Sequence, residues 1–193
     1  SQVATARPQR PGAARAAPML PLPGVEVRIV VEGEDAAAGE PGEIVVGGPT
    51  VMQGYLDDPA ATALALRDGW LHTGDIGFLD DAGGLHVLDR RDDLIVSGGE
   101  NVYPAEIEAV LVVHPSVAEA GVAGVPDAEL GSRVVAWIVA NDAATVDSQT
   151  LADFCRARLA GFKRPREFRF VSVLPRTAAG KLQRRRLTDL PPS

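Results

Sequence analysis

A carboxylate that directly follows a glycine lies in the segment Trp70-Leu71-His72-Thr73-Gly74-Asp75. Gly74 allows a sharp turn of the backbone, and Asp75 then presents two acceptor oxygens, which suit a vicinal diol such as that of ribose. Arg90 follows after one strand–turn–strand excursion, so we expect it to return to the same edge as Asp75. A carboxylate beside a guanidinium predicts a nucleoside-sugar site; an Asx turn at Asp75 and a solvated charge run at Arg90 and Arg91 are the alternatives.

Two adjacent glycines, Gly98 and Gly99, lie between an expected strand over 93–96 and an expected helix that begins near Pro104. Their bare backbone permits the close approach of an extended ligand. No lysine follows them, so they do not form a phosphate loop of the strand–GxxxxGK[ST]–helix type. A simple tight turn is the alternative interpretation.

A lysine, Lys181, ends the segment Pro175-Arg176-Thr177-Ala178-Ala179-Gly180-Lys181. Pro175 replaces the first glycine of a phosphate loop and Leu182 replaces its serine or threonine, which excludes Mg²⁺–nucleotide binding of that type. What remains is a lysine at the tip of a glycine-containing loop, which can bring one positive charge to a site where negative charge develops. An ordinary surface lysine is the alternative.

Metal ligation and disulfide formation are not predicted. The three histidines are scattered along the chain, and Cys155, the single cysteine, has no CxxC partner. A single cysteine fits a reducing compartment, and we expect a cytoplasmic protein.

The composition is that of an ordinary soluble globular protein, because 46% of the 193 residues are hydrophobic and 23% are charged. The net charge of −7 disfavours nucleic acid and anionic membranes as partners. The longest apolar run, 134–140, is too short to span a bilayer, and residues 1–17 contain no apolar segment of a signal peptide.

The first half of the chain predicts a small antiparallel sheet. Residues 1–21 form a start rich in Ala, Arg and Pro, which we expect to be loosely ordered. Val25, Val27 and Ile29 alternate with polar residues, and short strands are expected at 44–46, 76–79 and 85–88. Tight turns between short strands indicate a β-barrel-like subdomain over 22–89.

The second half, 94–193, predicts a compact α+β domain, so the expected fold class of the whole chain is α+β. Helices are expected from Pro104 and around 151–159, the latter ending near Gly161. Strands are expected at 117–125, at 134–140 and around Phe168 and Phe170. The run of five charged residues over 89–93 predicts an exposed hinge, which we place at 90–93.

The order and spacing of these motifs resemble those of adenylate-forming enzymes, the superfamily of acyl-CoA ligases, peptide-synthetase adenylation domains and firefly luciferase. The resemblance runs from about Leu22 to Leu187 and rests on the segments Gly42–Gly48 with Gly54-Tyr55, Trp70–Asp75, Arg90–Glu108, Gly161–Pro165 and Pro175–Lys181. Residues 87–108 are most similar to o-succinylbenzoate–CoA ligases of menaquinone biosynthesis, although fatty-acyl and aryl-CoA ligases share much of this segment.

The resemblance implies two chemical steps, formation of an acyl-adenylate from ATP and displacement of AMP by the thiol of coenzyme A. It assigns Asp75 and Arg90 to the ribose of ATP or AMP, and Lys181 to the acyl carboxylate and the α-phosphate during adenylation. It also assigns Asp92 to the hinge between the two steps, and Gly98 and Gly99 to the pantetheine of coenzyme A. A carboxylic acid and coenzyme A are then the expected partners, and a homodimer stays open.

The family's Ser/Thr/Gly-rich phosphate loop and its Thr-Glu motif, whose Glu holds Mg²⁺, do not occur in these 193 residues. Most of the acyl pocket is also expected elsewhere, so this stretch alone is not expected to be catalytically competent. A stand-alone module that binds AMP or coenzyme A without catalysis, or that acts in interactions, is the alternative. The Ser97–Asn101 segment argues against a peptide-synthetase piece.

Overall fold

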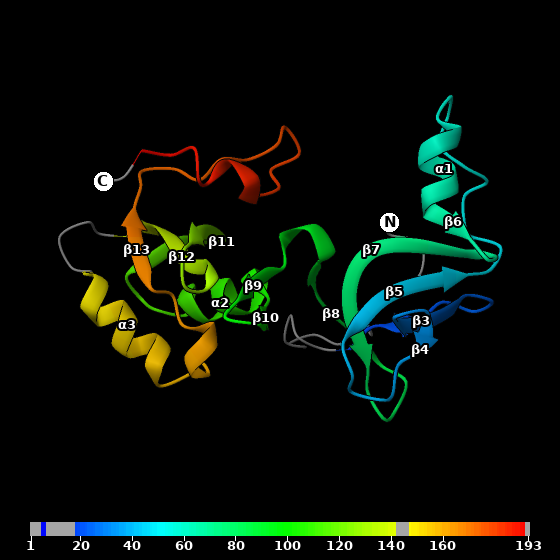
Figure 1. Ribbon diagram of the computed structural model, residues 1–193, viewed down its shortest axis with the longest axis horizontal. Helices are drawn as coiled ribbons and strands as arrows, with labels where there is room; N and C mark the ends of the chain where they lie inside the picture. The colour runs from blue at the N-terminus through cyan, green and yellow to red at the C-terminus, as the bar shows by residue number, and fades with distance from the viewer. Residues whose placement is uncertain (1–4, 7–17, 142–146, 192–193) are drawn as a thin grey trace. The chain divides into compact units, whose positions relative to one another are not determined.

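The computed structural model describes residues 5–6, 18–141 and 147–191, and the chain divides into two compact units, 1–92 and 93–193 (Figure 1). The boundary falls within the charged run 89–93. Each unit combines strands with few helices, so the chain is a mixed α and β protein. No helix in the described part of the chain is long and apolar enough to cross a membrane.

The first unit is built on a curled antiparallel sheet with the strand order β4-β3-β5-β7-β6, and β8 pairs with β7. The register shifts between Glu43 and Val45 and between Ile76 and Gly77, and such bulges bend a strand. Figure 1 shows β7 bending strongly along its length. The strands are β3 (Glu26–Val31), β4 (Glu34–Asp35), β5 (Gly42–Gly47), β6 (Leu66–Arg67), β7 (Trp70–Leu79) and β8 (Leu85–Arg90).

One face of this sheet carries the core of the unit, which includes Ile29, Ile44, Val46 and Leu85. Alternation in β3 directs Ile29 inward, as the sequence predicts. A short helix, α1 (Pro59–Ala65), precedes β6 and begins at Asp58, whose side chain accepts a hydrogen bond from the amide of Ala61. The sequence did not predict α1, because none of its residues is buried and it has no apolar face.

The start of the chain, 1–21, was expected to be loosely ordered, and residues 1–4 and 7–17 lie outside the described ones. Of the remainder, β1 (Thr5–Ala6) pairs with β2 (Leu20–Pro21). Met19 exchanges two backbone hydrogen bonds with Leu85, of 2.9 and 2.8 Å, which attaches this part of the chain to β8.

The second unit contains a three-stranded sheet of order β11-β12-β13, in which β12 and β13 are parallel. A short β9–β10 hairpin precedes it; one helix comes before β11 and a second lies between β12 and β13. The elements are η1 (Arg91–Asp93, which spans the boundary between the units), β9 (Ile95–Ser97), β10 (Glu100–Val102), α2 (Pro104–Leu111), β11 (Val117–Asp127), β12 (Gly131–Ala140), α3 (Ser148–Arg156), η2 (Gly161–Lys163), β13 (Glu167–Phe170) and η3 (Arg184–Arg186).

Both faces of β12 are covered, which explains its continuous apolar run. Val134, Ala136 and Ile138 face the core formed with α2 and α3, whereas Val135 and Trp137 face a second cluster. That second cluster contains Leu174 and Leu187 from the C-terminal segment, so this segment packs across the sheet opposite the two helices. The helix predicted over 151–159 ends at Arg156, earlier than Gly161, although Leu159 is still buried.

Candidate functional site

Asp75 and Arg90 are direct cross-strand neighbours, on β7 and β8 respectively. The Nε atom of Arg90 donates a hydrogen bond of 2.9 Å to Oδ1 of Asp75. The Asp75 side chain is 29% exposed and that of Arg90 is 65% exposed, so both groups face solvent at one edge of the sheet. The expected return of Arg90 to the edge that carries Asp75 is therefore observed.

Thr73 and Gly74, the two residues before Asp75, fix the backbone at this position. The hydroxyl of Thr73 donates to the carbonyl of Ile44 over 2.7 Å and accepts from the amide of Asp75 over 3.0 Å. Gly74 has a φ of +70°, a left-handed conformation that glycine adopts at little cost. An Asx turn at Asp75 is excluded in the described structure, because its carboxylate accepts from Arg90 and from no backbone amide.

A second acidic residue, Glu43 on β5, holds the same region together. Its carboxylate accepts from Nδ1 of His72 over 3.1 Å and from the amide of Gly74 over 3.3 Å, and it lies 3.6 Å from a terminal nitrogen of Arg91. Its side chain is only 14% exposed. The sequence did not predict this role, because His72 and Gly74 lie 29 and 31 residues away from Glu43 and meet it only when β5 pairs with β7.

The Asp75–Arg90 pair fits a ribose. Within the described ranges Oδ2 of Asp75 accepts no hydrogen bond, which leaves an acceptor on a partly exposed carboxylate already oriented by a guanidinium. The fit does not extend to a metal: among residues 5–6, 18–141 and 147–191 no group of three or more His, Cys, Asp and Glu side chains is placed to hold an ion.

Gly98 and Gly99 form the two-residue turn between β9 and β10, where Ser97 pairs with Glu100. Their φ angles are +60° and +84°, and two-residue hairpin turns with positive φ at both positions strongly favour glycine. The tight-turn interpretation is thus correct for the backbone. A Cβ atom built on Gly99 would meet nothing within 4 Å, whereas one on Gly98 would lie 3.3 Å from a methyl group of Leu130.

Lys181 lies at the end of a small hairpin. The amide of Thr177 donates to the carbonyl of Lys181 over 2.8 Å, and the Lys181 amide donates to the Thr177 hydroxyl over 3.1 Å. Gly180, with a φ of +77°, makes the turn. The Lys181 side chain is exposed, and its ammonium group contacts no hydrogen-bonding partner in the described part of the second unit.

Arg176 closes this hairpin and attaches it to the sheet. One terminal nitrogen donates to the carbonyl of Gly180 over 2.7 Å, and the other forms an ion pair with Glu119 of β11. Leu182, directly after Lys181, packs in the cluster around Trp137. The backbone that carries Lys181 is therefore held on both sides while its charge stays in solvent.

The remaining predicted residue, Asp92, is exposed and lies in the 3₁₀ turn η1, as the last residue of the first unit. The structure thus joins Asp75 with Arg90 in one unit, and it places the glycine turn and the Lys181 hairpin in the other.

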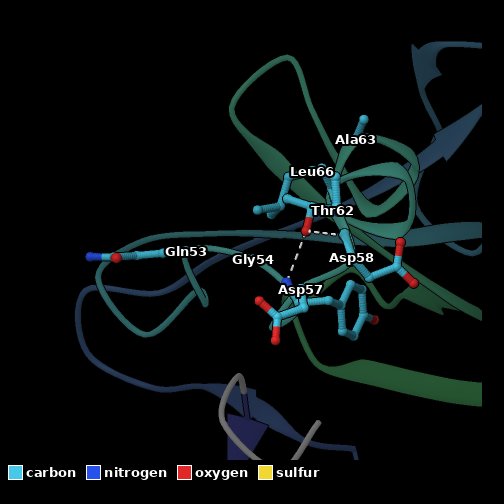
Figure 2. A pocket seen from close by; sticks show the side chains of 9 residues that line it. Gln53, Gly54, Asp57, Asp58, Thr62, Ala63 and Leu66 are labelled. Atoms are coloured by element: carbon cyan, nitrogen blue, oxygen red, sulfur yellow. Dashed lines mark hydrogen bonds between the residues drawn. The ribbon is translucent and has the colours of Figure 1, made fainter.

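An open pocket of about 450 Å³ lies elsewhere in the first unit, between the turn before α1 and α1 itself (Figure 2). Gln53, Tyr55 and Asp57 line it from the turn, and Thr62 lines it from the helix. The Thr62 hydroxyl accepts from the amide of Tyr55 over 2.9 Å and donates to the carbonyl of Asp58 over 2.8 Å. None of the predicted site residues lines this pocket.

Comparison with known families decides the relationship. Residues 106–181 match the AMP-binding enzyme C-terminal domain, and residues 2–56 match the AMP-binding enzyme family. The chain belongs to the AMP-binding enzymes. The resemblance to adenylate-forming enzymes that the motifs indicate is confirmed, and residues 106–181 include both the end of α2 and the Lys181 hairpin.

Individual AMP-binding enzymes are similar to most of the chain. The 2-succinylbenzoate–CoA ligase of Bacillus licheniformis is 50% identical over 187 residues, which are 97% of this chain and 39% of that protein. The o-succinylbenzoate CoA synthetase of Bacillus subtilis, solved with its acyl-adenylate intermediate, is 46% identical with a TM-score of 0.86, over 89% of this chain and 35% of that one. A structure of the same synthetase with ATP and a magnesium ion is 46% identical with a TM-score of 0.84, over 88% of this chain and 35% of that one.

This chain therefore spans about 39% of the length of the curated relative it matches. The similarity to o-succinylbenzoate–CoA ligases, expected from residues 87–108, extends over nearly the whole chain.

Proposed function

We propose that the chain supplies the C-terminal part of an AMP-forming acid–CoA ligase whose acid substrate is 2-succinylbenzoate. The observation that carries the proposal is its 46% identity and TM-score of 0.86 with a synthetase solved with the acyl-adenylate of that acid. The reaction class has two steps: a carboxylate oxygen bonds to the α-phosphorus of ATP as pyrophosphate leaves, and the thiol sulfur of coenzyme A then bonds to the acyl carbon as AMP leaves.

Asp75 and Arg90 bind the ribose in this proposal. The unengaged oxygen of Asp75 accepts a hydrogen bond from a ribose hydroxyl, and Arg90 keeps the carboxylate oriented. Glu43, through Gly74 and His72, limits the movement of the backbone beneath Asp75. The Mg²⁺ that accompanies ATP is expected to take its ligands from outside this pair.

Lys181 serves the first step. Its exposed ammonium group neutralises the negative charge of the acyl carboxylate and of the α-phosphate as the new P–O bond forms. A hairpin with a fixed backbone suits this role, because a charge that is already positioned needs little rearrangement when the reaction occurs.

Gly98 and Gly99 serve the second step. The turn presents bare backbone, so the pantetheine arm of coenzyme A can pass it without meeting a side chain. Asp92 is the pivot about which the second unit turns between the two steps, a hinge motion typical of enzymes that use one domain in two catalytic states.

A chimera tests the proposal. The segment of the Bacillus licheniformis ligase that matches this chain is replaced by residues 1–193, and AMP, pyrophosphate and 2-succinylbenzoyl-CoA are measured. We expect ATP-dependent formation of the thioester, with loss of activity when Asp75→Ala is introduced. A folded chimera that forms no acyl-adenylate would contradict the proposal.

The alternative, a stand-alone module that binds AMP or coenzyme A, is tested with the 193-residue chain. A titration with AMP, ATP and coenzyme A should give dissociation constants of about a millimolar or weaker. The reason is that these 193 residues carry only part of the proposed binding site and so make few contacts with each ligand. Micromolar binding of any of the three would favour the stand-alone module.

A further inference from the structure

An ion cluster in the second unit connects three segments that are far apart in the sequence. Arg184 donates from Nε and a terminal nitrogen to the two oxygens of Glu108, over 2.9 and 2.7 Å. Its other terminal nitrogen donates to Oδ2 of Asp93 over 2.8 Å. Glu108 lies on α2, Asp93 ends η1, and Arg184 begins η3.

The cluster is largely removed from water. The side chains of Arg184 and Asp93 are each 18% exposed, and that of Glu108 is 15% exposed. One carboxylate oxygen of Glu108 also accepts from the amide of Val122, on the outer edge of β11. Partly buried, charge-assisted and bidentate bonds of this kind are among the stronger polar contacts in proteins, so the cluster holds its three segments rigidly.

Arg184 and Asp93 each lie close in sequence to a residue with a proposed role in the reaction. Arg184 lies three residues after Lys181, and Asp93 directly follows Asp92. Arg176 fixes the hairpin before Lys181, and the cluster fixes the chain after it. The segment after the proposed pivot and the segment after the proposed catalytic lysine are thereby joined through the guanidinium of Arg184.

We propose that Arg184 is a positioning residue which, by binding Glu108 and Asp93, makes the Lys181 hairpin and the first residue after the pivot parts of one rigid body. Rotation of the second unit then brings the Lys181 ammonium to a reproducible position. This inference rests on the proposed function of Lys181, and it predicts that weakening the cluster slows adenylation but not thioester formation.

The test uses the chimeric ligase and Asp93→Ala, which removes one contact of Arg184 and leaves the bidentate contact with Glu108. Adenylation is followed by single-turnover release of pyrophosphate, and thioester formation is measured from supplied acyl-adenylate. We expect adenylation to fall by about tenfold or more, in its rate constant rather than in the KM for the acid, since a misplacement of about 1 Å costs up to about a hundredfold. Asp93→Asn, which keeps an acceptor, should restore most of the rate.

Matched controls come from the same segment. Asp189→Ala removes an exposed carboxylate and Arg186→Gln removes an exposed guanidinium, and both should leave the two half-reactions unchanged. Arg184→Lys keeps one charge but loses the bidentate geometry, so it should show the same selective loss as Asp93→Ala. Circular dichroism establishes that each variant is folded, and Arg184→Lys takes the place of Asp93→Ala if the latter does not fold.

A double-mutant cycle separates positioning from general stability. In the Lys181→Ala background, Asp93→Ala should cause no further loss of residual adenylation, because its effect passes through the lysine. An equal loss in both backgrounds, or a loss in adenylation less than about fivefold greater than that in thioester formation, would overturn the inference. Normal adenylation by Lys181→Ala alone would overturn the proposed function instead.

Discussion

At the scale of single residues, the glycines of the β9–β10 turn can be explained by the backbone conformation of the turn and by space for a ligand. Gly98 and Gly99 have positive φ angles that a two-residue hairpin requires, and this alone accounts for two glycines. The open space at the Cβ position of Gly99 is what leaves room for an additional role. A substitution that keeps the turn but adds a side chain therefore separates the requirement for positive φ from the requirement for open space.

Gly99→Asn is that substitution, because asparagine tolerates positive φ better than other residues with a side chain. We expect the free energy of unfolding to change by no more than about 1 kcal/mol, and thioester formation in the chimera to slow by about tenfold, with normal adenylation. Gly69→Asn is the matched control: Gly69 also has a positive φ and open space, in the two-residue turn between β6 and β7. Equal effects of the two variants on the thioester step would exclude the pantetheine role.

At the scale of elements, the sequence predicted best where one strand or helix carries its own signal. The alternation of Val25, Val27 and Ile29 and the proline at the start of α2 are local signals; β3 lies where the alternation predicts a strand, and α2 begins at Pro104 as predicted. The exposed helix α1 carries no such signal, and the glycines of β7 interrupt its alternation, so its length was missed. Glu43 and Arg184 act through partners that only folding brings near, which no local pattern indicates.

The burial of Cys155 in helix α3 can be tested through the pH dependence of the free energy of unfolding. Burial raises the pKa of the Cys155 thiol to about 11, from an ordinary value of 9.0. The folded state therefore holds this proton more tightly than the unfolded state, so its contribution to stability is complete below pH 9.0 and is lost as the pH rises towards about 11. Urea unfolding of the 193-residue chain at pH 8.5 and pH 10.5 should show a decrease of about 1 to 2 kcal/mol from this group.

Cys155→Ala has no thiol and supplies the reference for other groups that titrate in this range. Its loss of stability between the two pH values should be smaller than that of the unchanged chain. The same pH dependence in both proteins would show that α3 does not shield the thiol.

At the scale of the whole molecule, the proposed site residues are distributed over the two units. The first unit carries the Asp75–Arg90 pair on a sheet edge, and the second carries the glycine turn and the Lys181 hairpin on opposite sides of its own core elements. The order of the motifs along the chain was enough to predict the family. The ion pairs of Arg184 could not be predicted, because they depend on contacts over as many as 91 residues.

The most direct test of this account is the effect of Lys181→Ala on the two half-reactions of the chimeric ligase. Adenylation, followed by pyrophosphate release, should fall by at least about a hundredfold, which corresponds to the loss of one positioned charge. Thioester formation from supplied acyl-adenylate and coenzyme A should stay within about twofold of the unchanged chimera. An equal loss in both steps, or no loss in adenylation, would contradict the assignment of Lys181 and with it the central claim.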